Sequence, residues 1–80
     1  MESMLIKAQL RKDIKGFEEL SLRLRSKKLH LMSETIATTE PLVERNLNHM
    51  ISRIDSMIWA ADEIIASMRF LRQHPFNQDR

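Results

Sequence analysis

The residues with the most potential for chemistry are three histidines and one adjacent pair of acids. His30, His49 and His74 are the only imidazoles, and none lies three or four residues from another, so helical spacing builds no metal pair. Asp62 and Glu63 are neighbours, so on a helix they diverge instead of converging on one proton. We therefore expect no metal site, no cofactor and no catalytic residues.

Glycine and cysteine usage excludes further classes of site. Gly16 is the only glycine, whereas phosphate-binding loops, dinucleotide-binding loops and nucleophile elbows need several. The chain has no cysteine, so it has neither a disulfide framework nor a thiolate metal site. We also find no signal peptide and no uncharged apolar run near the roughly 18 residues of a membrane helix. We expect a cytoplasmic protein that is not an enzyme.

The basic stretch from residue 23 to 30 is a candidate for binding nucleic acid. Residues 7–30 carry eight Lys or Arg against three acids, while residues 31–80 carry five against seven. This asymmetry could attract phosphates, or it could select the partner helix within an antiparallel pair. Leucines separate the basic residues, and no aromatic platform accompanies them. Nucleic acid is therefore a possible but less favoured ligand, and a solvated or membrane-surface face is the competing interpretation.

A long helix from residue 41 to 73 dominates the predicted architecture. Pro41 suits a first helical turn, and the segment stops before His74-Pro75. Its apolar residues alternate in steps of four and three, which predicts a heptad seam facing another helix. We name three columns of this stripe after one member each. The predicted seam combines the Ala61 column (Leu47, Ile54, Ala61 and Met68) with the Met57 column (Val43, Met50, Met57, Ile64 and Leu71). The Ile58 column (Ile51, Ile58 and Ile65) lies beside the seam.

A second helix is predicted from residue 3 to 37, joined to the first by a short turn at 38–40. Short connections between long helices make antiparallel neighbours. We therefore predict an all-α chain with a single domain over residues 1–80, folded as an antiparallel coiled-coil hairpin with a frayed tail at 74–80. Lys27 or Lys28 interrupts the inner stripe of helix 3–37, and Gly16 is the candidate position for a bend or a break in this helix. The predicted inner stripe is Ile6, Leu10, Ile14, Phe17, Leu20, Leu24 and Leu31.

The first helix carries a surplus apolar line, which we call the Leu29 line. On a helix this line points away from Leu24 and Leu31, so one hairpin cannot bury both lines. Trp59, the only tryptophan, also falls outside the predicted seam. Exposed apolar and aromatic residues of this kind are typical of interfaces, so we predict that they contact a partner chain. The Leu29 line consists of Leu22, Leu29, Met32 and Ile36.

Two stretches resemble the small type III secretion needle co-chaperones. The stretch Ala61-Asp62-Glu63-Ile64-Ile65-Ala66-Ser67-Met68-Arg69-Phe70 is similar to the end of their second helix, and residues 22–28 are similar to part of their first. The match covers about a third of the chain, which departs from the family in its longer first helix and its Pro75-Phe76 tail. The resemblance implies a cytoplasmic bacterial protein that pairs with a larger helical-repeat chaperone and keeps the needle subunit from polymerising.

These observations favour a small helical module that binds protein, as a co-chaperone or assembly subunit. The first alternative is a homodimeric four-helix bundle that binds nucleic acid through its basic first helix. The second is a structural subunit of a larger coiled-coil assembly. The wide apolar stripe on so small a chain also predicts that the protein associates, with itself or with a helical partner.

Overall fold

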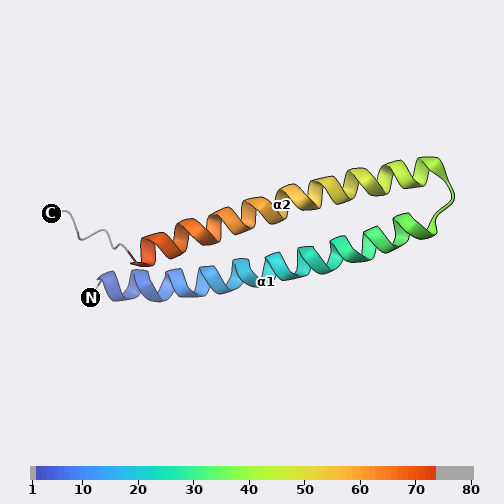
Figure 1. The fold of residues 1–80 in the computed structure, drawn as a ribbon. Helices are drawn as coiled ribbons and strands as arrows, with labels where there is room; N and C mark the ends of the chain where they lie inside the picture. The colour runs from blue at the N-terminus through green and yellow to red at the C-terminus, as the bar shows by residue number, and fades with distance from the viewer. Residues whose placement is uncertain (1, 74–80) are drawn as a thin grey trace.

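The structure, a computed structural model, is a hairpin of two long α-helices and describes residues 2–73. Helix α1 spans Glu2–Ala37, and helix α2 spans Pro41–Gln73. The helices run antiparallel and pack along their length, so the start of α1 and the end of α2 lie at one end of a rod 61 Å long (Figure 1). The predicted all-α hairpin is confirmed, α1 begins one residue before its predicted start, and the predicted frayed tail at 74–80 lies outside the described residues.

The turn at residues 38–40 is held by local hydrogen bonds. Thr38 N donates to Glu34 O at 3.0 Å and closes the last turn of α1. Glu40 N donates to Thr38 Oγ1 at 3.2 Å, and Glu40 O accepts from Glu44 N at 2.9 Å, which makes Glu40 the residue that precedes α2. Pro41 then fills the first helical position, where a missing N–H costs nothing. The chain therefore reverses with little unpaired backbone.

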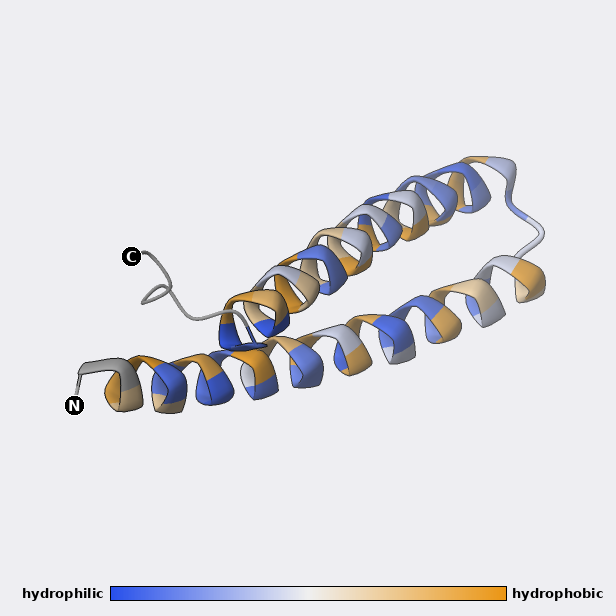
Figure 2. Ribbon diagram, turned by 60° about the vertical axis from the view of Figure 1, so that its left-hand side comes forward, coloured by the Kyte–Doolittle hydropathy of each residue, from blue (hydrophilic) through white to orange (hydrophobic). Residues whose placement is uncertain are grey.

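The face of α2 that packs against α1 differs from the predicted seam by one column. The Ala61 column does lie against α1, but its companion is the Ile58 column, whose members Ile58 and Ile65 are buried. The Met57 column was predicted to be inside and this was wrong for four of its five members: Val43, Met50, Met57 and Ile64 are exposed, and Leu71 is half-buried. Figure 2 accordingly shows hydrophobic residues, in orange, on the outward-facing as well as the inward-facing sides of the helices.

Ion pairs on the acidic edge of α2 explain this rotation. Asp55, Asp62 and Arg69 each follow a member of the Ala61 column, and each reaches a charged partner on α1. Turning α2 to bury the Met57 column would swing these three side chains away from α1. It would also expose a column made only of isoleucines in exchange for a column in which two of five residues are flexible methionines. The observed rotation keeps both the pairs and the better-packed side chains.

The packing face of α1 is a regular heptad seam in which apolar and polar residues alternate from Phe17 to Thr35. The spacing alternates between four and three from Leu10 to Thr38. Ser21 occupies the buried position that was predicted for Leu20, and Leu20 is instead 38% exposed. Ile6, which was also predicted to lie inside, is 44% exposed. The interruption predicted at Lys27 or Lys28 falls at Lys28. The seam residues are Leu10, Ile14, Phe17, Ser21, Leu24, Lys28, Leu31, Thr35 and Thr38.

Gly16 does not break α1, which is continuous through it. A Cβ at this position would meet nothing within 4 Å, so close packing within the hairpin does not require a glycine here. Gly16→Ala should therefore stabilise the hairpin by about 1 kcal/mol, because alanine restricts the unfolded chain and favours helix. Urea unfolding followed by circular dichroism measures the effect. A loss of stability would show that something outside the hairpin approaches this backbone.

Candidate protein-binding groove

The edge of the hairpin that bears the ion pairs between α1 and α2 is hollowed at one point, and we call this edge the groove. Its floor is a row of charged side chains that bridge the two helices. Arg25 Nη2 lies 2.6 Å from Asp62 Oδ2, Lys28 Nζ lies 2.6 Å from Asp55 Oδ1, and Glu18 pairs with Arg69. These side chains are each one-third to one-half exposed, so each pair stabilises the hairpin by no more than about 1 kcal/mol.

The floor also contains the one buried polar residue among those described, Ser21. Its Oγ donates to Asp62 Oδ1 at 3.0 Å and accepts from Arg25 Nε at 3.3 Å. Every buried side-chain polar atom in the described part of the chain has a hydrogen-bond partner. The Ser21, Arg25 and Asp62 cluster is therefore fully satisfied within the hairpin. It needs no ligand, and it fixes how the two helices are aligned.

Apolar side chains form the two shoulders of the groove. Glu18, Ser21 and Leu22 from α1 and Asp62, Ile65, Ala66 and Arg69 from α2 line a hollow of about 420 Å³ in it. Leu22 and Ala66 thus stand on opposite shoulders. One heptad nearer the turn, the same alignment puts Leu29 opposite Trp59. Leu29 is 65% exposed and Trp59 68%, so both are available to a partner.

The structure therefore gathers the predicted partner-binding residues on one edge. Leu22, Leu29 and Ile36 lie seven residues apart on the α1 shoulder, with Met32 beside them, and all four are exposed. The expectation that one hairpin cannot bury both lines of α1 is confirmed. The charged floor is the part of the site that the sequence did not reveal. The signal was present in the spacing of Asp55, Asp62 and Arg69, because seven residues separate each from the next.

The chemistry that this groove offers is recognition of an apolar surface. No group of three or more His, Cys, Asp or Glu able to hold a metal ion occurs among residues 2–73. In the same segment, no helix is both long and apolar enough to cross a membrane. Comparison with protein-family models, with curated proteins and with solved structures finds no match to this chain.

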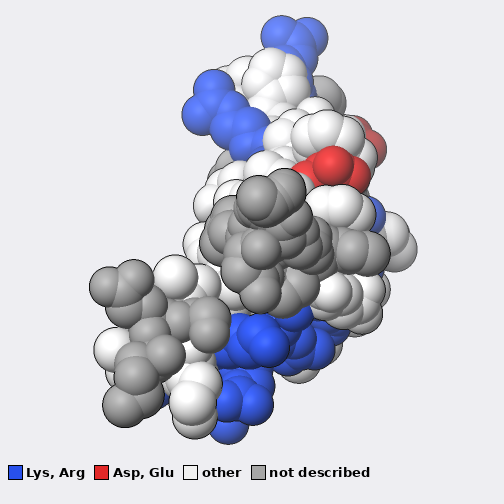
Figure 3. Space-filling model, turned by 90° about the vertical axis from the view of Figure 1, so that its left-hand side faces the viewer, with Lys and Arg blue, Asp and Glu red and all other residues white. Residues whose placement is uncertain are grey.

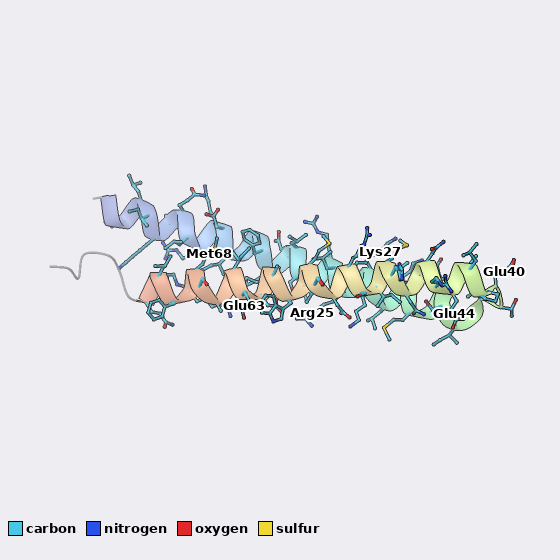
Figure 4. All side chains as sticks on the ribbon, turned by 90° about the horizontal axis from the view of Figure 1, so that it is seen from above. Arg25, Lys27, Glu40, Glu44, Glu63 and Met68 are labelled. Atoms are coloured by element: carbon cyan, nitrogen blue, oxygen red, sulfur yellow. The ribbon has the colours of Figure 1, made fainter. Side chains whose placement is uncertain are left out.

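The basic residues of α1 do not form one face. Arg25 and Lys28 are engaged with acids of α2, and Figure 4 shows Arg25 and Lys27 at opposite edges of the hairpin. Viewed from the end with the termini, Lys and Arg gather along the lower edge of the molecule and again near the top (Figure 3). The charge that phosphates would meet is thus divided and partly neutralised within the fold.

We expect no binding to mixed DNA or RNA below micromolar concentration in gel shifts at physiological salt. The reason is that a phosphate track needs several unpaired cations on one side, which the stretch 23–30 does not supply. Sub-micromolar binding that disappears when Arg23, Arg25, Lys27 and Lys28 become glutamine would contradict this expectation and favour the nucleic-acid alternative.

Proposed function

We propose that the protein is a non-catalytic binding module that holds a helix of a larger helical protein in the groove. The observation that carries the proposal is the pairing of two apolar shoulders, centred on Leu29 and Trp59, across a floor whose charges are already neutralised. A partner need not supply compensating charges there, since each ion in the floor has its counterion within the hairpin. Affinity would come from apolar contact, with aromatic and aliphatic anchors at the centre.

The geometry favours a helical partner over an extended one. The exposed residues of the α1 shoulder recur every seven residues, so their spacing along the rod is about 10 Å. A partner helix with apolar residues at heptad spacing matches that repeat, whereas a strand repeats every two residues. The resulting three-helix arrangement would cover the Leu29 line and the indole of Trp59 together.

The resemblance to type III secretion needle co-chaperones suggests a specific form of this function. The larger partner would be a helical-repeat chaperone in the bacterial cytoplasm, and the complex would keep the needle subunit from polymerising. The groove supports the general proposal, that of a co-chaperone or assembly subunit, through its size and composition. The identity of the partner rests on the resemblance of residues 22–28 and 61–70.

The test is capture of the partner from the native host, identification by mass spectrometry, and titration of the purified pair. Leu29→Glu should weaken binding at least about 30-fold, because a central apolar anchor contributes about 2 kcal/mol or more. Ser26→Glu on the same helix is the matched control, since it adds the same charge at an exposed site outside the groove and the seam. Circular dichroism should show that both variants remain helical.

Two results would contradict the proposal. One is an affinity for the purified partner that Leu29→Glu leaves unchanged. The other is a Leu29→Glu variant that loses its helix, because Leu29 would then belong to the internal core instead of the partner surface.

A further inference from the structure

The edge opposite the groove carries a second apolar surface, formed by the Met57 column of α2 and by Leu20 of α1. Glu34 and Val43 line one hollow near the turn, which fixes the alignment of the helices on this edge. Two heptads further from the turn, the same alignment brings Leu20 beside Met57. Met57 is 52% exposed and Leu20 38%, so apolar side chains from both helices meet at this point without covering one another.

The apolar residues of α2 are spaced symmetrically about Met57. Met50 and Ile64 lie seven residues on either side of Met57, and Val43 and Leu71 lie fourteen. A second α2 laid antiparallel over the first, with its own Met57 at the centre, would place Met50 against Ile64 and Val43 against Leu71. Every layer of that contact would be apolar. In an interface with two-fold symmetry the same surface meets its own copy, so it must be complementary to itself.

The charges on the α1 side of this edge would pair with opposite charges on a second α1 that runs antiparallel to the first. Asp13 precedes Leu20 by seven residues, and Lys27 follows it by seven. An antiparallel copy centred on Leu20 therefore puts Asp13 of each chain opposite Lys27 of the other, twice in the assembly. Within the described residues Lys27 has no ion pair, and Asp13 accepts one hydrogen bond, from Gln9.

The surface area of the chain leaves room for such a contact. The chain exposes 6373 Å² at a mass of 9.5 kDa, whereas a compact monomer of that mass exposes about 5,000 Å². A stable dimer buries about 800 Å² on each partner, which is about an eighth of the surface that this chain exposes. No large side chain among those described is fully buried, so the hairpin has a thin core to which a second copy would add.

We propose that this edge binds a second copy of the chain, forming a two-fold four-helix bundle with its axis at Leu20 and Met57. In this bundle α1 packs antiparallel on α1 of the partner subunit, and α2 packs antiparallel on its α2. The groove with Leu29 and Trp59 stays outside the contact, so each subunit keeps one groove. The dimer does not depend on the proposed function, because it uses the other edge of the hairpin.

Charge exchange at Asp13 and Lys27 tests the proposal by sedimentation equilibrium. The native chain should be a dimer at ten micromolar. Lys27→Asp should raise the dissociation constant at least about 10-fold, because each copy then sets Asp13 against another acid. The double variant Asp13→Lys with Lys27→Asp should restore the dimer, since the pairs are the same with their signs reversed. Leu29→Glu, on the opposite edge, should leave the dimer unchanged even if it removes partner binding.

Cysteine cross-linking locates the axis independently. The native chain has no cysteine, so Met57→Cys introduces a single thiol. At a two-fold axis the two thiols of the assembled protein should form a disulfide when oxidised glutathione is added, with glutathione as the oxidant, whereas the thiols of Ser26→Cys should not. The proposal is overturned if the native chain is monomeric at ten micromolar, if the double variant fails to recover the dimer, or if Ser26→Cys cross-links as readily as Met57→Cys.

Discussion

Ile58→Glu should abolish the folded hairpin. The Ile58 side chain is 8% exposed, and the alignment that joins Ser21 to Asp62 places it in the layer of Leu24. A carboxylate there would be buried in an apolar layer without a cation to pair with, and burying an unpaired charge costs several kcal/mol. Domains of this size are stable by about 4–12 kcal/mol, and a thin core belongs near the lower end of that range. One such charge is therefore enough to unfold the chain, and the helical signal at 222 nm should fall to that of a coil.

The neighbouring residue supplies the control for this prediction. Met57→Glu places the same charge one position earlier, where the side chain is 52% exposed and water can solvate it. This variant should retain its helical signal, although we expect it to lose the proposed dimer. If Met57→Glu unfolded the chain and Ile58→Glu did not, the Met57 column would be the inner one and the rotation of α2 described above would be wrong.

Lys28→Leu should stabilise the hairpin by about 1–2 kcal/mol and raise its melting temperature by about 5–10 °C. Lys28 occupies a seam position, and its side chain is only 33% exposed, so its stem already lies against α2. A leucine there would bury more apolar surface, which contributes about 1.5–3 kcal/mol. The lost pair with Asp55 subtracts no more than about 1 kcal/mol, because that pair is open to water.

Thermal unfolding by circular dichroism measures this effect. Ser26→Leu is the control, because Ser26 is exposed and lies outside the seam, the groove and the proposed dimer contact, so its replacement should leave the stability nearly unchanged. A destabilised Lys28→Leu variant would mean that the ion pair with Asp55 holds the two helices together more strongly than apolar packing does at this layer.

The helices could be predicted well from the sequence because the start of α2 and the spacing of its apolar residues are both clearly marked. Pro41 marks the start, and the steps of four and three mark a seam. The choice between the Met57 column and the Ile58 column was not available from α2 alone, since both are apolar throughout. It depends on where Asp55 and Asp62 meet cations of α1, which is a property of the pair of helices. A prediction that counted apolar residues on one helix could not include it.

The same limitation explains the prediction of Leu20 inside the seam. Ser21 is the less apolar residue, yet it takes the inner place because it satisfies Asp62 and lies next to Ala61 in the alignment of the helices. Two small residues at one layer let the backbones approach closely, and a leucine at position 21 would crowd that layer. The exposure of the Leu29 line was easier to predict, because a helix with two apolar lines cannot bury both against one partner helix.

The arrangement of the chain ends has a mechanical consequence. Because α1 starts and α2 ends at the same end of the rod, a pulling force applied through the two termini would load one layer of the seam at a time (Figure 1). The layers of Leu10 and Ile14 would open first, and the turn at Thr38 last. Opening by successive layers requires less force than shearing all layers together. The hairpin should therefore open under less force when its two ends are pulled apart than when the helices are pulled past one another along the rod.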